Sequence, residues 1–306
     1  MNIVFMGTPD FAVPSLLRLI EDGHNILAVY TQPDKPQGRK FILTPPAVKE
    51  AAILNKIEVF QPDTLKSPQV KEQLKSLSPD LIVVAAYGKI LPKDILEIPA
   101  KGCINVHGSL LPKYRGAAPI QWAVINGEKT SGVTIMQMAE GLDTGDILLK
   151  SELEIGEDET AGELFDRIAT LGADALSKTV SEIDNIKPVS QEEALATWAP
   201  PLKKQDGLVD WAQSAEAVYS RIRGITPWPG AYTLLNDERK VKIHKARLLQ
   251  ENGSSGELLD KKRLIIGCGE NSLELTEVQL DGAKKISGEE FIRGQRLTPG
   301  TLFKVN

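Results

Sequence analysis

The chain has 306 residues, of which 42% are apolar and 25% charged, and its net charge at pH 7 is −5. This length is comfortable for two domains, and the composition is that of an ordinary globular protein. No apolar run approaches the roughly 20 residues needed to span a bilayer, and Met1 is followed at once by a strand-like run. We therefore expect no membrane segment, no signal or transit peptide and a cytoplasmic location. The two cysteines, Cys103 and Cys268, are expected to be buried free thiols.

The first 186 residues alternate strand-like and helix-like runs. Strands are predicted over residues 2–6, 26–31, 57–61, 80–86, 103–106, 133–138 and 147–153, and helices over 13–22, 45–55, 68–77, 118–126 and 160–184. The run 81–86 is apolar throughout, which suits a strand covered on both faces. This order predicts an α/β fold with a doubly wound, mainly parallel, Rossmann-like sheet. In such sheets ligands bind at the carboxyl ends of the strands.

The pattern changes after residue 186. Pro188, Pro200 and Pro201 interrupt a polar stretch, which is typical of an interdomain linker. One short helix is then predicted at 214–223, with strand-like runs at 231–235, 240–248, 264–267, 273–280 and 300–303. Short strands at this spacing predict a small OB-like β-barrel. We therefore expect an N-terminal domain over 1–186, a linker over 187–206 and a C-terminal barrel domain over 207–306.

Charge is distributed unevenly along the chain. Residues 1–186 carry 18 basic and 25 acidic residues, whereas residues 187–306 carry 18 and 16. The C-terminal part is mildly basic, which permits contact with a nucleic acid without establishing it.

The turn after the first predicted strand reads Gly7-Thr8-Pro9-Asp10. It lacks the second and third glycines of the dinucleotide-binding motif G-x-G-x-x-G, and Pro9 has no N–H to donate. A turn that lines a substrate site is the better interpretation than one that binds a dinucleotide.

Three polar residues form the strongest candidate for a catalytic site. Asn105 and His107 lie two residues apart at the end of an apolar run, so both can face one cleft. Asp143 lies between Gly141 and Gly145, in a turn where the backbone can approach a ligand. A carboxylate there can hydrogen-bond the imidazole and fix its tautomer. Together the three groups suffice for proton transfer and oxyanion stabilisation, without a metal or a nucleophile. The alternative is a polar cluster that only caps the sheet.

These residues carry a family resemblance. Asn105-x-His107-x-Ser109-Leu110-Leu111-Pro112-x-Tyr114-Arg115-Gly116, followed by Gly141-Leu142-Asp143-Thr144-Gly145, resembles the signature of the folate-dependent formyltransferases. The segments 7–14, 31–39 and 226–231 and the C-terminal part are similar to the methionyl-tRNA formyltransferases in particular. The formyltransferases of the purine pathway resemble only the first two hundred or so residues of this chain and lack its C-terminal part. The formyltransferase of the lipid A aminoarabinose pathway lacks the long basic loop after Thr31.

The resemblance implies a formyl donor, 10-formyltetrahydrofolate, a tRNA acceptor, no metal and the catalytic set Asn105, His107 and Asp143. By the same resemblance, the residues expected to bind the folate are Ser109, Leu110, Leu111, Pro112, Gly141, Leu142 and Thr144. The residues expected to contact tRNA are Lys35, Arg39, Lys40, Lys203, Lys204, Lys240 and Lys242. Many relatives read Gly-Arg-Gly-Lys-Lys where this chain has Gly38-Arg39-Lys40-Phe41-Ile42, so its loop is less charged and stiffer. Phe41 either adds stacking or apolar contact to RNA or anchors the loop on the protein.

The hypothesis from the sequence is a monomeric enzyme of translation initiation, which formylates the α-amino group of initiator methionyl-tRNA. A second hypothesis is formylation of an amino-sugar nucleotide on the same catalytic core. A third is an RNA-binding protein with a vestigial catalytic core, against which the intact set Asn105, His107 and Asp143 argues.

Overall fold

The computed structural model describes residues 1–38, 41–235 and 237–304. The chain forms two compact units. Unit 1 comprises Met1–Pro119, Thr130–Glu154 and Phe165–Ala199. Unit 2 comprises Ile120–Lys129, Ile155–Leu164 and Pro200–Asn306. Within the described part of the chain, no helix combines the length and the apolar character needed to cross a membrane.

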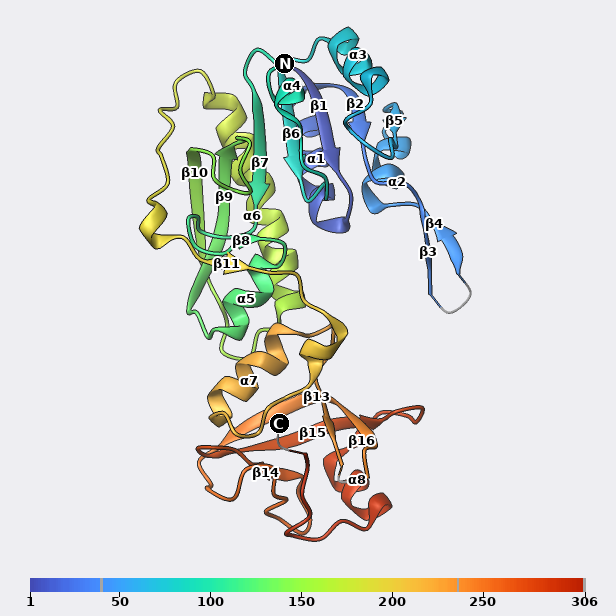
Figure 1. Cartoon of the computed structure of the whole chain (residues 1–306), viewed down its shortest axis with the longest axis vertical. Coiled ribbons are helices and arrows are strands. Elements are labelled where there is room, and N and C mark those ends of the chain that lie inside the picture. The colour runs from blue at the N-terminus through green and yellow to red at the C-terminus, as the bar shows by residue number, and fades with distance from the viewer. Residues whose placement is uncertain (39–40, 236, 305–306) are drawn as a thin grey trace. The chain divides into compact units, whose positions relative to one another are not determined.

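Unit 1 is built on a seven-stranded sheet with the order β10-β9-β7-β6-β1-β2-β5 (Figure 1). Its strands are β1 (Asn2–Gly7), β2 (Asn25–Tyr30), β5 (Val59–Phe60), β6 (Leu81–Ala85), β7 (Cys103–His107), β9 (Thr130–Gln137) and β10 (Ile147–Glu154). The pairs from β5 through β7 are parallel, whereas β9 runs antiparallel to both β7 and β10. The sequence prediction of a mainly parallel α/β sheet is confirmed. All residues of β6 are buried, as its unbroken apolar run requires.

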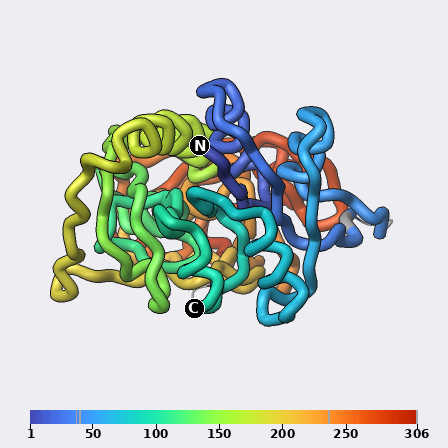
Figure 2. The backbone as a smooth tube through the Cα atoms, turned by 90° about the horizontal axis from the view of Figure 1, so that it is seen from above, coloured from blue at the N-terminus to red at the C-terminus, as the bar shows by residue number. Residues whose placement is uncertain are grey.

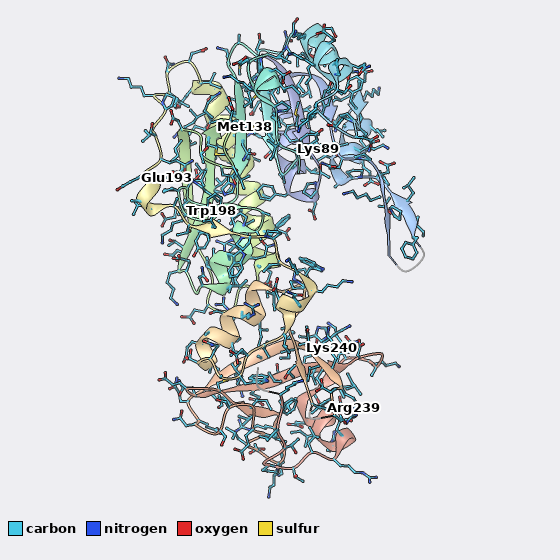
Figure 3. The ribbon with its side chains drawn as sticks, in the orientation of Figure 1. Lys89, Met138, Glu193, Trp198, Arg239 and Lys240 are labelled. Carbon is cyan, nitrogen blue, oxygen red and sulfur yellow. The ribbon has the colours of Figure 1, made fainter. Side chains whose placement is uncertain are left out.

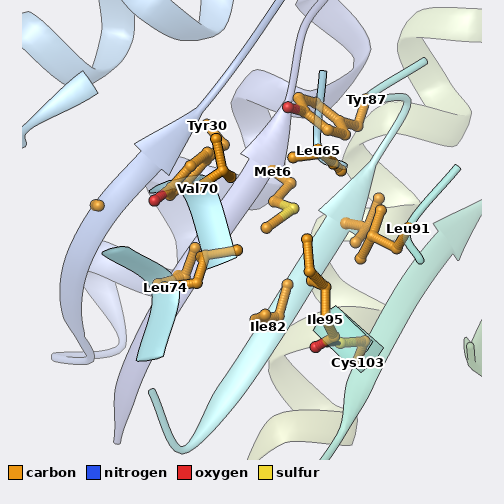
Figure 4. Packing of buried hydrophobic residues seen from close by; sticks show 13 residues of the cluster. Met6, Tyr30, Leu65, Val70, Leu74, Ile82, Tyr87, Leu91, Ile95 and Cys103 are labelled. Atoms are coloured by element: carbon orange, nitrogen blue, oxygen red, sulfur yellow. Dashed lines mark hydrogen bonds between the residues drawn. The ribbon is translucent and has the colours of Figure 1, made fainter. Parts of the chain in front are cut away.

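Helices cover both faces of this sheet. They are α1 (Val13–Glu21), α2 (Ala47–Leu54), α3 (Pro68–Leu77), α4 (Lys93–Leu96) and α6 (Ala161–Glu182), and a short 3-10 turn, Asp10–Ala12, precedes α1. On one face, α3 and α4 contribute Leu74 and Ile95 to a core that includes Met6 and Ile82 (Figure 4). On the other face, α6 lies so close that a Cβ on Gly172 would come within 2.9 Å of Val106. Burial on both faces fixes the strand ends from which the candidate site is built.

Among the described residues, four short strands lie outside the main sheet of unit 1. β3 (Lys35–Gln37) and β4 (Ile42–Thr44) form an antiparallel hairpin that extends away from the sheet (Figure 1). After α6 the chain runs along the outer side of β10 (Figure 2). There Val189 and Ile147 exchange two backbone hydrogen bonds. It then pairs β11 (Trp198–Ala199) in parallel with β8 (Arg115–Gly116). The first part of the predicted linker is therefore hydrogen-bonded to unit 1.

Unit 2 contains a five-stranded antiparallel sheet. Its strands are β12 (Tyr232–Leu234), β13 (Lys240–Leu249), β14 (Ile265–Gly267), β15 (Ser272–Leu280) and β16 (Ile286–Ser287). Isolated bridges continue from β14 through Leu258–Ile266, Glu257–Leu302 and Phe303–Leu235 back to the end of β12. The sheet thus closes on itself, which agrees with the predicted small barrel.

The helices of unit 2 are α5 (Pro119–Ile125), α7 (Ala215–Gly224) and α8 (Gly288–Gln295). Trp211 is fully buried, and its indole N–H donates to Thr233 Oγ1 at 2.9 Å. α8 was not predicted, because two glycines weaken its helical pattern, although Ser287 and Glu290 form a capping box at its start. The predicted strand at 300–303 is reduced to isolated bridges because it follows a turn at Gly300.

Candidate functional site

Asn105 and His107 lie at the carboxyl end of β7, on one face of the strand. Asn105 is half-buried, and its side-chain amide has no hydrogen-bond partner among the residues that the structure describes. His107 is 6% exposed. An accessible amide beside a buried imidazole leaves one donor available to a ligand and one ring held in place.

The imidazole of His107 lies between two neighbours. Its Nε2 lies 3.0 Å from the carbonyl oxygen of Tyr114, and its Nδ1 lies 3.7 Å from Asp143 Oδ2. Because a carbonyl only accepts, Nε2 carries a proton in this contact, and Nδ1 is the ring nitrogen that can take up or release one. The structure therefore brings His107 and Asp143 together. The expected direct hydrogen bond between them is not closed, because 3.7 Å exceeds normal hydrogen-bond length.

Asp143 lies in a loop held against β9 and β8. Its Oδ2 accepts a hydrogen bond of 2.9 Å from the backbone N–H of Gly116, and its φ of +53° is left-handed. Two residues later, a Cβ on Gly145 would lie 1.6 Å from the carbonyl oxygen of Gln137. Only glycine fits at position 145, so close packing against β9 sets where the Asp143 carboxylate lies.

The residues expected to bind folate differ in their exposure. Ser109 is 1% exposed and donates to the Lys113 carbonyl at 2.7 Å, and Leu111 is fully buried next to a cis Pro112. Thr134 Oγ1 accepts from the Leu111 N–H at 3.0 Å and donates to the Ser109 carbonyl at 2.7 Å. In the structure, Ser109 and Leu111 therefore shape the loop itself.

The other expected folate residues lie nearer the solvent. Leu110, Pro112 and Thr144 are half-buried, Gly141 is exposed, and the side chain of Leu142 is 53% exposed. An exposed leucine next to Asp143 offers apolar surface to a ligand. Contact between these residues and folate stays a prediction.

The residues expected to contact tRNA are spread over both units. Lys35 is exposed on β3, whereas Arg39 and Lys40 lie outside the described residues. Figure 3 labels Lys240 on β13, whose Nζ lies 3.6 Å from the centroid of the Tyr232 ring. The remaining three are Lys203 and Lys204, which are exposed, and Lys242, which is half-buried and lies 3.4 Å from Asp281.

Several contacts of the site were not foreseen from the sequence. The carbonyl of Tyr114 and the N–H of Gly116 are main-chain groups of the signature segment, so no side-chain pattern marks them. Gln191 donates to the carbonyls of Asp143 and Gly145, at 2.8 Å each. It lies 48 residues after Asp143, in a stretch that reads as a polar linker. Only the folded structure brings it to the site.

In the described part of the chain, both side chains and main-chain groups contribute to the site. No cluster of three or more His, Cys, Asp or Glu residues that could hold a metal ion occurs there. An accessible amide, an imidazole whose Nδ1 is not engaged by the Tyr114 carbonyl and a carboxylate are suited to stabilise an oxyanion and to move a proton.

Comparison with known proteins shows which family the chain is similar to. Residues 1–180 match the formyl transferase family, and residues 201–296 match the formyl transferase C-terminal domain. Two solved structures share the fold at low sequence identity. The N-formyltransferase from Helicobacter canadensis, in complex with folinic acid and dTDP-3-aminofucose, has a TM-score of 0.68 and 19% identity over 93% of this chain and 99% of that chain. HypX from Aquifex aeolicus, in complex with tetrahydrofolic acid, has a TM-score of 0.62 and 18% identity over 95% of this chain and 47% of that one.

Sequence similarity is much higher to one group within the family. The methionyl-tRNA formyltransferase of Geobacter metallireducens is 49% identical over 304 residues, which cover 98% of this chain and 97% of that protein. Both the N-terminal and the C-terminal region match, and the similarity extends along almost the whole chain. The chain therefore belongs to the formyl transferase family, within the group of the methionyl-tRNA formyltransferases.

Proposed function

We infer that this chain transfers the formyl group of a formyl-folate to the α-amino group of methionyl-tRNA. The observation that carries the inference is the 49% identity to a methionyl-tRNA formyltransferase along 98% of the chain. The geometry at the end of β7 supports it, because Asn105, His107 and Asp143 supply the groups that acyl transfer between two nitrogens needs. We further propose that the donor is 10-formyltetrahydrofolate and the acceptor is the initiator tRNA. That substrate implies a cytoplasmic enzyme of translation initiation.

In the proposed reaction the amine nitrogen forms a bond to the formyl carbon, and the bond from that carbon to the folate nitrogen breaks. An α-amino group has a pKa of about 7.7–8, so a useful fraction is neutral near pH 7 and little base strength is needed to start. The demanding step is the tetrahedral intermediate, whose oxygen becomes negative. Asn105 is proposed to donate its accessible amide N–H to that oxygen.

The attacking nitrogen must also lose a proton while the leaving nitrogen gains one. His107 Nδ1 is the ring nitrogen not engaged by the Tyr114 carbonyl, and it faces Asp143 Oδ2. We propose that this nitrogen moves the proton and that the carboxylate complements the positive imidazolium while the proton is held. No net proton is consumed, so one histidine serves both nitrogens.

We keep the expected division of the chain as a proposal, with catalysis in 1–186, a linker over 187–206 and tRNA binding in 207–306. We propose that the folate site is lined by Leu110, Pro112, Leu142 and the backbone of 141–144. The exposed lysines Lys35, Lys203 and Lys204 attract the phosphates of the tRNA together with Lys240 and Lys242. We propose that the enzyme acts as a monomer.

A formylation assay tests the function directly. The purified chain and 10-formyltetrahydrofolate are mixed with one acceptor in each of three parallel reactions. The acceptors are initiator Met-tRNA, an elongator Met-tRNA and a UDP-linked amino sugar. We expect rapid formylation of the initiator alone. Preferential formylation of the amino sugar would assign the chain to the second hypothesis, and tRNA binding without any turnover would leave an RNA-binding protein.

A further inference from the structure

We propose that Gln191 is a positioning residue, which holds the Asp143 loop so that the carboxylate faces His107. The inference rests on the proposed function, because Asp143 matters only if it serves formyl transfer. Gln191 belongs to the 189–199 segment, which follows α6 and on which Figure 3 labels Glu193 and Trp198.

Both ends of the Gln191 carboxamide are engaged. Its Nε2 donates to the carbonyl oxygens of Asp143 and Gly145, at 2.8 Å each. Its Oε1 accepts from Nε and Nη2 of Arg115, at 3.1 and 2.9 Å. One side chain thus ties the catalytic loop to the segment that follows His107 in sequence. An isolated surface amide would not be held at four points.

Arg115 decides which way this amide points. A guanidinium only donates, so the oxygen of Gln191 must face Arg115 and the nitrogen is left for the two carbonyls. Arg115 is 1% exposed, and Glu193 holds it through contacts of 2.9 Å to both Nη1 and Nη2. The hydrogen bonds from Arg115 hold the pKa of the Glu193 carboxyl below its usual value, which means that Arg115 stabilises the charged form of its partner.

The 189–199 segment also reaches the carboxylate of Asp143 through β8. The N–H of Arg115 donates to the Thr197 carbonyl at 2.8 Å, and the N–H of Ala117 donates to the Ala199 carbonyl at 2.9 Å. Between them, the N–H of Gly116 donates to Asp143 Oδ2. The same segment therefore supports Asp143 at its main chain through Gln191 and at its carboxylate through Gly116. Such support suits a residue with φ of +53°, since a left-handed conformation persists where neighbouring contacts impose it.

The test uses near-isosteric variants. Gln191→Glu keeps an oxygen for the contact to Arg115 but replaces the Nε2 that donates to the two carbonyls with a second oxygen. Gln191→Met keeps about the same side-chain volume and removes both the donor and the acceptor of the carboxamide. Glu193→Gln weakens the anchor of Arg115 by removing the charge of an exposed side chain, and thermal unfolding checks that the fold survives. Glu192→Gln is the matched control, because it makes the same charge change on an exposed neighbour.

Each variant is made in the wild-type chain and again with Asp143→Ala. The measured quantity is the single-turnover rate of formyl transfer from 10-formyltetrahydrofolate to Met-tRNA, with thermal unfolding as the fold control. A residue that acts through Asp143 has little left to lose once that carboxylate is gone, whereas independent losses multiply.

We expect Gln191→Glu and Gln191→Met to lower the rate by roughly ten- to hundredfold, Glu193→Gln by a few-fold and Glu192→Gln by less than twofold. In the Asp143→Ala chain the further loss should stay below about threefold for the Gln191 variants, and Glu193→Gln should change the rate by less than about 1.5-fold. Unchanged rates in the Gln191 variants, or losses that multiply in both backgrounds, would overturn the inference. If the Gln191 variants do not fold, Glu193→Gln in the two backgrounds decides it. A wild-type chain without formyl transfer would instead overturn the proposed function.

Discussion

The end of β7 in unit 1 and the basic strand β13 in unit 2 hold their functional side chains in different ways. His107 and Asp143 are 6% and 11% exposed, and each is fixed by main-chain contacts. On β13, the side chain of Lys242 is 42% exposed, and its ion-pair partner Asp281 is 64% exposed. Buried, fixed groups act as a unit, whereas exposed charges attract a polyanion additively and weakly. Single changes should therefore be severe in the first region and mild in the second.

The largest effect is expected for His107→Ala. Removing the group that moves the proton should lower the single-turnover rate by about 10²- to 10⁴-fold. The fold should survive, because only one contact to a carbonyl and one imidazole volume are lost. Turnover close to that of the wild type would refute the role given to His107 and, with it, the contrast between the two regions.

A smaller but still large effect is expected for Gly145→Ala. The added Cβ would lie 1.6 Å from a backbone oxygen, so the Asp143 loop must move. We expect the free energy of unfolding to fall by roughly 1–3 kcal/mol and the single-turnover rate to fall at least tenfold. Gly294→Ala in α8 is the matched control, because nothing lies within 4 Å of its Cβ. It should raise the free energy of unfolding by about 0.5–1 kcal/mol. Denaturant unfolding measures the stability of the two variants, and the single-turnover assay measures their rates. Equal effects of Gly145→Ala and Gly294→Ala would mean that the Asp143 loop is not constrained as described.

Lys240→Gln and Lys242→Gln should act on binding alone. Each should raise the KM for Met-tRNA by a few-fold, leave kcat within about twofold and lower the salt slope of binding by ~1. Lys178→Gln, an exposed lysine of α6 in unit 1, provides the same charge change at a control position. A loss of kcat in either β13 variant would show that the strand takes part in the chemistry.

The smallest effect is expected from alkylation of the cysteines. Burial raises the pKa of both Cys103 and Cys268 to about 12. The reactive thiolate is then scarce at pH 8, so iodoacetamide should neither modify nor inactivate the folded protein within an hour. Mass spectrometry after treatment, with urea-unfolded protein as the positive control, checks this. Rapid labelling of the folded chain would show that one of the two cores opens readily.

The sequence predicts local and periodic features well. The apolar run at β6 and the expected helix at α3 match the structure closely, and both cysteines are buried free thiols as expected. The pairing of Asn105 with His107 follows from strand periodicity alone.

Contacts between residues that lie far apart in the chain are harder to predict from the sequence. Gln191 reaches Asp143 across 48 residues, and a glutamine in a proline-flanked polar stretch carries no pattern that marks the partner. The N–H of Gly116 and the carbonyl of Tyr114 are main-chain groups, which every residue possesses. The reversed direction of β9 is likewise set by tertiary pairing rather than by its own sequence.

The most direct test of the contrast between the two regions is the salt dependence of the wild-type reaction. The KM for Met-tRNA and the single-turnover rate at saturating tRNA are measured from 50 to 200 mM salt. We expect the KM to rise steeply with salt, because exposed lysines supply the attraction, and the rate to change by less than about twofold. A rate at saturation that falls in parallel with affinity would contradict it, because the exposed charges would then be part of the catalytic step.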